Sequence, residues 1–368
     1  MIVNGTTPVW VHPRFDAERH MAHPPEPDDV RRALEQHPDA KGMLLITPTD
    51  WGTCADIRGV AAVCHEHDVP LIVDEAWGAH LPFHAGLPTW GMDADADLVV
   101  TSVHKMGAAI EQSSVFHLQG NRVDPTVLAQ REDLLATTSA SSLVYASLDG
   151  WRRHMVEQGE ALLGRTLDLA RRARAEIAAI DGIEVYGDEL VREGHAHEVD
   201  PFVLTLDVRA LGITGYQASE ILRDHHHVDL GAADTWRVGA RLTHADDDES
   251  VDLLVRTLRS LVDDARRAET PPRVDFPSTE GLELETVMLP REAFFAEVEQ
   301  VSAQQAVGRV AAEMVTPYPP GVPVIAPGER ITQDAVDYLR SGVAAGMLIP
   351  EAADPQVDTL RVVRDSGA

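Results

Sequence analysis

The stretch that decides the fold is VPLIVDEAWGAH, residues 69–80. It begins with a short apolar run that suits a strand buried on both faces, and the run stops at Asp74. A similar strand, DLVVTS at residues 97–102, follows along the chain, and Lys105 comes just after it. Because ligands bind beyond the carboxyl ends of the strands in a parallel sheet, we expect Asp74 and Lys105 to converge there.

The flanking sequence alternates between helical and strand-like segments. Residues 27–37 and 56–67 read as helices, and residues 42–47 read as a further buried strand. This alternation predicts an α/β fold with a mostly parallel sheet and helices on both faces. The rest is predicted to contain strands at 113–118, 183–186, 201–208 and 236–242 and helices at 148–179, 215–224 and 247–267.

A chain of 368 residues is too long for one ordinary core, so several domains are expected. We predict a large domain over residues 1–150, a smaller α/β domain over 151–270 and a C-terminal α+β unit over 280–368. The segment 269–279, rich in proline and charge, is the predicted linker. No apolar run is long enough for a membrane helix and the start lacks a leader pattern, which predicts a cytoplasmic protein without a membrane partner.

The charge of the chain limits its partners. A formal net charge of -29 argues against nucleic-acid binding, which needs a basic face. The acidity is compatible with cationic small molecules, although a general need for solubility explains it equally well. Of the 31 basic residues only Lys41 and Lys105 are lysine. Since a guanidinium stays protonated and cannot form a Schiff base, a retained lysine is a candidate for amine chemistry.

The two cysteines and the run of three histidines are not predicted to form a disulfide or a metal site. Cys54 and Cys64 offer neither a disulfide framework nor metal-ligand spacing, so both are predicted to be buried packing residues. Residues 225–227 are three consecutive histidines. Because neighbouring residues of a strand do not share a face, a solvated strand edge is favoured over a metal site.

Several short motifs together carry a resemblance to a known family. They are VDEAWGAH at 73–80, TSVHK at 101–105 followed by Gln112, TTS at 137–139, Glu313, YPPGVP at 318–323 and PGE at 327–329. In this order and spacing they resemble the ornithine/lysine/arginine decarboxylases, which are fold-type-I pyridoxal-phosphate-dependent enzymes. The resemblance extends over nearly the whole chain.

The resemblance implies a role for each motif residue. Lys105 would form the internal aldimine with pyridoxal 5'-phosphate, and Asp74 would keep the pyridine nitrogen protonated, which makes the ring an electron sink. The implied reaction is the decarboxylation of lysine, ornithine or arginine to the corresponding amine, a step of polyamine metabolism. The other implied contacts are Ser102 on the phosphate, His104 against cofactor and substrate, Ala76 beneath the ring, and Trp77 beside the ring and the substrate.

Two further implications concern the neighbouring subunit and the substrate. Thr137 or Thr138 would reach the phosphate of a neighbouring subunit, which implies a homodimer or higher oligomer with shared active sites. Glu313 is the candidate partner for the distal cation of the substrate, because a buried cation needs a carboxylate. No metal is implied.

The sequence also departs from the family pattern. The family sheet normally begins with a segment carrying a phosphate-cradling loop and a ring-stacking histidine, and residues 1–48 contain neither. Asp50 stands where an aromatic residue is usual, and Val103 where a hydroxyl residue is common. We therefore expect a chain that lacks the N-terminal part of the large domain.

Two alternatives remain open. One is another fold-type-I reaction such as transamination, which needs an arginine for the α-carboxylate that the sequence does not single out. The other is an inactive homologue that pairs with, or regulates, a full-length subunit.

Overall fold

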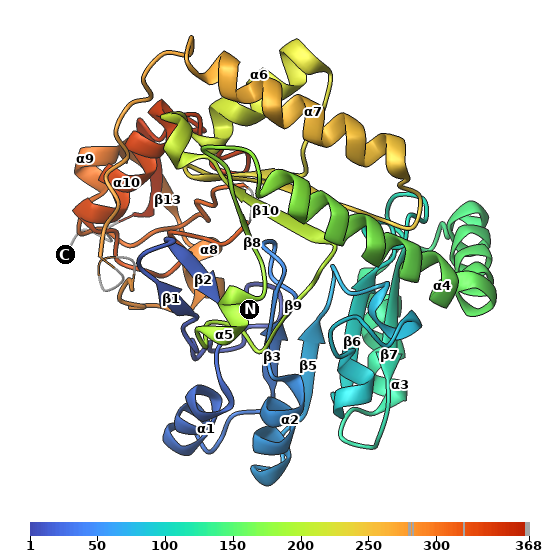
Figure 1. Cartoon of the computed structure of the whole chain (residues 1–368). Helices are drawn as coiled ribbons and strands as arrows, with labels where there is room; N and C mark the ends of the chain where they lie inside the picture. The colour runs from blue at the N-terminus through green and yellow to red at the C-terminus, as the bar shows by residue number, and fades with distance from the viewer. Residues whose placement is uncertain (279–280, 282, 319–320, 365–368) are drawn as a thin grey trace.

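The computed structural model describes residues 1–278, 281, 283–318 and 321–364. Its larger sheet has the strand order β3-β5-β6-β7 and occupies the lower part of Figure 1. Three strands are parallel, and the fourth runs antiparallel to its neighbour: β3 (Met43–Ile46), β5 (Leu71–Asp74), β6 (Leu98–Ser102) and β7 (Ser114–Leu118). The predicted mostly parallel sheet is confirmed.

One face of this sheet is covered by α1 (Pro27–Gln36) and α2 (Ile57–Glu66). Their apolar side chains, such as Val30 and Val60, form one core with the strand residues. On the opposite face, Leu44 and Ile46 of the edge strand β3 are exposed. The expected covering of both faces therefore does not extend to β3 within the described residues.

A second sheet is antiparallel, with the order β11-β12-β10-β8. Its strands are β8 (Glu184–Tyr186), β10 (Val203–Asp207), β11 (Ala232–Ala233) and β12 (Arg237–Arg241). Three long helices lie against it in the upper part of Figure 1: α4 (Ser142–Ile177), α6 (Gly215–His226) and α7 (Asp248–Ala265). Together they bury the largest apolar core of the chain.

The C-terminal part forms a third core around an antiparallel pair of strands. Its elements are α8 (Pro290–Phe294), β13 (Val298–Ser302), α9 (Ala303–Ala306), α10 (Gln333–Ala344) and β14 (Thr359–Val363). Tyr216 of α6 packs against this core.

Short elements connect these parts. A hairpin of β1 (Arg14–Asp16) and β2 (Met21–His23), which the sequence did not predict, lies near the N-terminus. β4 (Thr53–Cys54) pairs with β9 (Glu198–Val199) and so joins the first and second parts of the chain. The remaining elements are the helix α5 (Glu189–Arg192) and the 3₁₀ turns η1 (Leu81–Phe83), η2 (Gly91–Ala94) and η3 (Arg209–Leu211).

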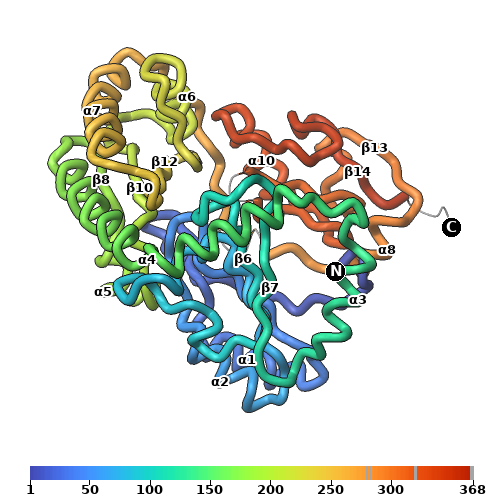
Figure 2. Tube along the Cα trace, turned by 90° about the vertical axis from the view of Figure 1, so that its right-hand side faces the viewer, coloured from blue at the N-terminus to red at the C-terminus, as the bar shows by residue number. Residues whose placement is uncertain are grey.

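The long helix α4 crosses the predicted boundary between the first two domains. It runs through residue 150, where a boundary was predicted, and it is preceded by α3 (Pro125–Leu135), which the sequence did not predict. Figure 2 shows α3 beside β7 at the edge of the larger sheet. Residues 279 and 280, at the other predicted boundary, lie outside the described residues, and the domain limits remain predictions.

Three smaller expectations have clear outcomes. Cys54 and Cys64 are buried and free, as predicted. The prediction that residues 225–227 form a strand edge is wrong: His225 and His226 complete the last turn of α6, and His227 caps that helix in a left-handed conformation. The reason is that α6 extends beyond residue 224, its predicted end, and includes His225 and His226. Within the described part of the chain, no helix has both the length and the apolarity to cross a membrane.

Candidate active site

The candidate site lies where β5 and β6 end. Asp74 is the last residue of β5, and it pairs with Val100 of the neighbouring parallel strand β6. Its carboxylate accepts a hydrogen bond from the backbone N–H of Ala76 at 3.1 Å. This bond fixes Asp74 in the turn after the strand, at the edge of the sheet where the sequence predicts the cofactor.

Lys105 lies in the turn that follows β6. Its backbone N–H donates to the carbonyl of Ser102 at 3.1 Å, which closes the turn directly at the strand end. Its Nζ atom lies 4.3 Å from the centroid of the Trp77 ring, a cation–π contact. The structure therefore brings Lys105 and Trp77 together from two successive strand ends, and places Ser102 in the same turn.

Arg241, at the end of β12, joins this group from the second sheet. Its guanidinium lies 3.8 Å from the centroid of the Trp77 ring. Its Nη2 donates to the backbone carbonyl of Asp50 at 2.6 Å, whereas Nε and Nη1 are buried and have no hydrogen-bond partner among the residues that the structure describes. Buried donors of a charged group are costly to leave unpaired, so these two N–H groups are suited to an anion.

Asp50 forms hydrogen bonds with two residues of this group, Trp77 and Arg241. The Trp77 indole N–H donates to its Oδ1 at 3.0 Å. Burial raises the pKa of Asp50, although Arg241, the Trp77 hydrogen bond and Lys105 oppose the shift. The residue noted in the sequence only as a departure from the family pattern thus orients both Trp77 and Arg241.

His104 points into a local hydrogen-bond network. Its Nδ1 lies 3.0 Å from the carbonyl of Ser113, and because a carbonyl only accepts, this nitrogen carries the proton. Its Nε2 lies 3.3 Å from Glu111. The predicted contact of His104 with cofactor and substrate stays a prediction.

Three predicted residues lie outside this group of contacts. Thr137 and Thr138 are exposed in the connection between α3 and α4, where the Thr137 hydroxyl accepts the N–H of Ser139 at 3.1 Å. Glu313 is buried in the C-terminal core, and its two oxygens accept the backbone N–H groups of Ala353 at 2.8 Å and Arg361 at 2.6 Å. These bonds serve the packing of that core, and the substrate role of Glu313 remains a prediction.

The loop after Glu313 does approach the site. Tyr318 lies in the neighbourhood of Arg241. The neighbouring Pro319 and Pro320 of the YPPGVP motif lie outside the described residues. The C-terminal core thus contributes to the surroundings of Arg241.

The residues present suit an anionic ring-shaped cofactor. Lys105 and Arg241 supply positive charge, Trp77 supplies an aromatic surface, and two buried donors of Arg241 lack a partner in the described part of the chain. The helix starts nearest in sequence do not suit a phosphate, because Glu26 and Asp29 form a capping box at α1 and Asp56 caps α2. Ser102 is therefore the predicted phosphate contact within this part of the chain.

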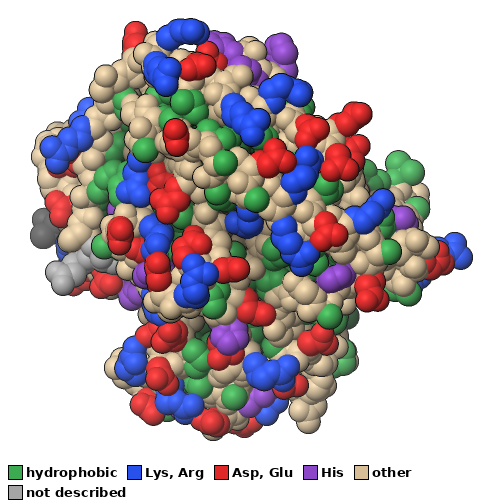
Figure 3. All heavy atoms as spheres, in the orientation of Figure 1, with side chains coloured by type: hydrophobic (Ala, Val, Ile, Leu, Met, Phe, Trp, Pro, Cys, Tyr) green, Lys and Arg blue, Asp and Glu red, His purple; other side chains and the backbone are tan. Residues whose placement is uncertain are grey.

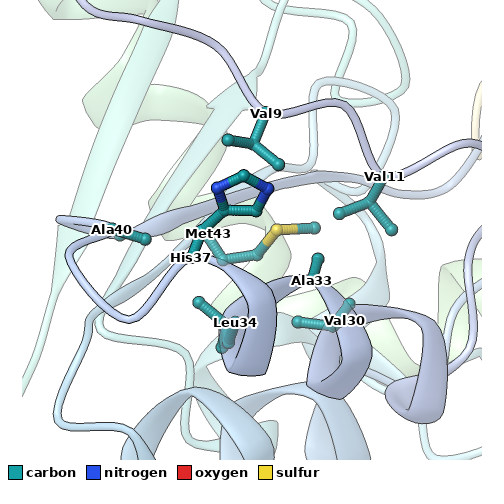
Figure 4. Close-up of a pocket in the computed structure, with 9 residues that line it drawn as sticks. Val9, Val11, Val30, Ala33, Leu34, His37, Ala40 and Met43 are labelled. Carbon is teal, nitrogen blue, oxygen red and sulfur yellow. The ribbon is translucent and has the colours of Figure 1, made fainter.

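A small pocket elsewhere is not part of this site. It lies between the N-terminal segment and α1, is lined by His37 and by apolar side chains such as Val9, Leu34 and Met43, and holds about 50 Å³ (Figure 4). Cofactor sites generally hold roughly 300 Å³ or more. The pocket is a packing gap beneath the N-terminal segment.

Comparisons with known proteins place the fold in a known class. The fold matches a pyridoxamine-pyruvate aminotransferase of Mesorhizobium loti with a TM-score of 0.52 over 66% of this chain and 65% of the other, at 16% identity. It matches the constitutive lysine decarboxylase of Escherichia coli with a TM-score of 0.77 over 99% of this chain, at 19% identity. The fold is therefore that of the fold-type-I pyridoxal-phosphate-dependent enzymes.

The sequence narrows this class to one family. The family profile "Orn/Lys/Arg decarboxylase, major domain" matches residues 1–232, and "Orn/Lys/Arg decarboxylase, C-terminal domain" matches residues 279–351. The chain is 38% identical to an arginine decarboxylase of Halalkalibacterium halodurans and 34% identical to one of Bacillus subtilis, in each case over 100% of this chain and 75% of the relative. The chain belongs to the Orn/Lys/Arg decarboxylase family. It spans 64% of the length of the Escherichia coli lysine decarboxylase.

Proposed function

We propose that this chain forms the catalytic part of a pyridoxal-phosphate-dependent decarboxylase of a basic amino acid, with arginine as the preferred substrate. The observation that carries the proposal is the group of Lys105, Trp77, Arg241 and Asp50 beside the end of β5. Arginine is placed first because the relatives with 38% and 34% identity are named arginine decarboxylases. The two free cysteines agree with a cytoplasmic location, which is part of the proposal.

Each residue has a distinct task in this proposal. Lys105 supplies the amine that holds the cofactor and that the amine of the substrate replaces. Asp74 holds a proton on the ring nitrogen through its negative charge. When bound, pyridoxal phosphate supplies the electron sink that allows a carboxylate to leave as carbon dioxide. Trp77 shields the reacting side from water.

Arg241 is the proposed partner of the substrate α-carboxylate. Its Nε and Nη1 donors have no partner among the described residues and point to different sides of the guanidinium, so one of them can donate a hydrogen bond to one oxygen of the carboxylate. Asp50 and Trp77 hold the guanidinium in place before the substrate arrives. The sequence did not single out this arginine because its position depends on how the second sheet packs against the first.

The distal cation of the substrate needs a carboxylate. Glu313 keeps this role in the proposal, because each carboxylate oxygen can accept more than the one backbone hydrogen bond that it already has. The overall acidity of the chain, a net charge of -29, also favours the approach of a cationic substrate. On the face shown in Figure 3 acidic and basic side chains are interspersed, which does not suit a nucleic acid.

A homodimer, or a higher oligomer built from it, is part of the proposal. The helix α3 buries none of its own residues, and large apolar side chains beside Thr137 and Thr138 are exposed, namely Leu134, Leu135, Leu143 and Tyr145. Exposed apolar groups gathered in this way mark a contact surface. A second copy of the chain would cover this surface and receive the two threonines.

The proposed activity can be tested with the chain itself. Pyridoxal phosphate is titrated into the purified protein, and the release of carbon dioxide is measured with arginine, lysine and ornithine as substrates. We expect a change in visible absorbance on cofactor binding and the highest kcat/KM with arginine. Amino transfer to a keto acid without carbon dioxide release would support the transaminase alternative, and the absence of both binding and turnover would support the inactive homologue.

Replacing Arg241 with lysine tests its assignment. Lysine keeps the positive charge but loses the fixed planar arrangement of donors, and a hydrogen bond to a charged group contributes about 1.5–3 kcal/mol. We therefore expect KM to rise by about 10- to 150-fold with a smaller change in kcat, measured by steady-state kinetics. The exposed Arg256, changed to lysine, is the control. An unchanged KM for Arg241→Lys would remove this residue from the carboxylate site.

A further inference from the structure

Asp16, His23 and His195 form a cluster away from Lys105. Asp16 ends β1, His23 ends β2, and His195 lies in the loop after α5. One ligand atom from each lies within 4.8 Å of the others. Asp16 and His23 are only 5% and 1% exposed, whereas His195 reaches the surface. Two imidazoles and one carboxylate are a common donor set for divalent transition metals.

His23 is the residue that calls for a ligand. Both of its ring nitrogens are buried without a hydrogen-bond partner among the described residues. Burying a polar group without a partner is costly, so such an arrangement requires an explanation. An imidazole nitrogen is a common metal ligand, so a metal ion would supply the missing partner.

The distance between Asp16 and His195 suits two ligands of one metal ion better than a hydrogen bond. The Oδ2 atom of Asp16 lies 3.6 Å from Nε2 of His195, which is too long for a good hydrogen bond. Two ligand atoms bound at about 2.0–2.2 Å to one tetrahedral zinc ion are separated by roughly 3.3–3.6 Å. The rings of His23 and His195 are stacked with centroids 5.3 Å apart, which places the two imidazoles side by side.

The surrounding charges support the carboxylate. Arg19 donates to Oδ2 of Asp16 at 2.8 Å and also contacts Glu193 at 2.8 Å. Ligating carboxylates are commonly held in this way by a second hydrogen-bond partner. The Oε2 atom of Glu193 lies 3.7 Å from Nε2 of His195, so a second carboxylate stands at the rim of the cluster. A second guanidinium, that of Arg14, also lies near the cluster, where it donates to the carbonyl of His195 and pairs with Glu26.

We propose that Asp16, His23 and His195 bind one divalent transition-metal ion of the zinc class, with Glu193 available as a fourth ligand. The ion has a structural role, because its ligands come from two segments far apart in the sequence. It fastens the hairpin β1–β2 to the loop after α5. This site is independent of the proposed decarboxylation.

The experiment is a titration of the cofactor-free full chain with Zn²⁺ and, separately, with Co²⁺. We expect one tightly bound ion per chain by calorimetry, a Co²⁺ absorption spectrum typical of low coordination number, and a Zn²⁺-dependent rise in Tm. Loss of one ligand in His195→Asn should weaken Zn²⁺ binding by about 100-fold or more. Asp16→Asn should act in the same direction.

Two controls make the outcome decisive. His195 is partly exposed, so its variant can fold even if the variant at the buried His23, His23→Gln, does not. The triple variant H225N/H226N/H227N removes the other concentration of histidines and should bind Zn²⁺ as the parent does. The proposal is overturned if the parent binds no ion, if His195→Asn and Asp16→Asn bind as the parent does, or if only the triple variant loses binding.

Discussion

Replacing Lys105 with arginine is expected to lower the turnover of the enzyme by on the order of 10⁴-fold or more. The guanidinium keeps the positive charge beside Trp77 but cannot act as the amine nucleophile at neutral pH. The loss should therefore be in kcat and in covalent attachment of the cofactor rather than in folding. Carbon dioxide release and circular dichroism measure the two effects.

The only other lysine of the sequence provides the matched control. Lys41→Arg should retain the activity of the parent chain. Borohydride reduction in the presence of pyridoxal phosphate, followed by peptide mapping, should place the cofactor on Lys105. Label on Lys41, or unchanged turnover in Lys105→Arg, would show that the assignment of Lys105 is wrong.

Replacing Asp74 with asparagine is expected to reduce turnover far more than cofactor binding. The substitution keeps the hydrogen bond to the N–H of Ala76 within reach but removes the negative charge at the end of β5. Breaking a buried charge pair costs roughly 3–5 kcal/mol. At about 1.4 kcal/mol per tenfold change, this corresponds to a loss of hundreds to several thousandfold in rate.

The control for Asp74 is an aspartate away from the site. Asp95, at the end of the η2 turn, can be changed to asparagine, which also tolerates its left-handed conformation. Steady-state kinetics at saturating cofactor would compare the two variants. A rate for Asp74→Asn within about threefold of the parent, a difference below roughly 0.7 kcal/mol, would remove Asp74 from the site.

The sequence predicted the part of the site that depends on strand ends. Apolar runs that stop at a polar residue locate β5 and β6 well, because a buried strand excludes charge along its length. The positions of Asp74 and Lys105 at strand ends therefore follow from local pattern alone, and their roles in the site stay predictions. The β3 strand was found in the same way, but the exposure of Leu44 and Ile46 was not, since a strand pattern does not show what covers each face.

The sequence did not predict the parts that depend on distant segments. Nothing in the sequence distinguishes Arg241 from the other 28 arginines, because its role depends on the packing of β12 beside the loop that contains Asp50. The hairpin β1–β2 is only three residues per strand and lacks a strong alternating pattern, so it gave no signal. The helix α6 ends at a left-handed cap, His227, a conformation that histidine seldom adopts. Because no sequence signal marks this end, the histidines after residue 224 were assigned to a strand.

The helix α4 has a mechanical consequence for an enzyme with shared sites. It is 36 residues long, so it extends for about 54 Å, and only its C-terminal part is buried in the second sheet's core. Its exposed beginning follows Thr137 and Thr138 directly. In the proposed homodimer the helix is rigid and connects the domain that carries Arg241 with Thr137 and Thr138. A small tilt of that domain would therefore displace the two threonines at the neighbour's site. Substrate binding in one subunit would then change the affinity of the other subunit for the cofactor. The two subunits of the dimer could therefore show cooperative kinetics.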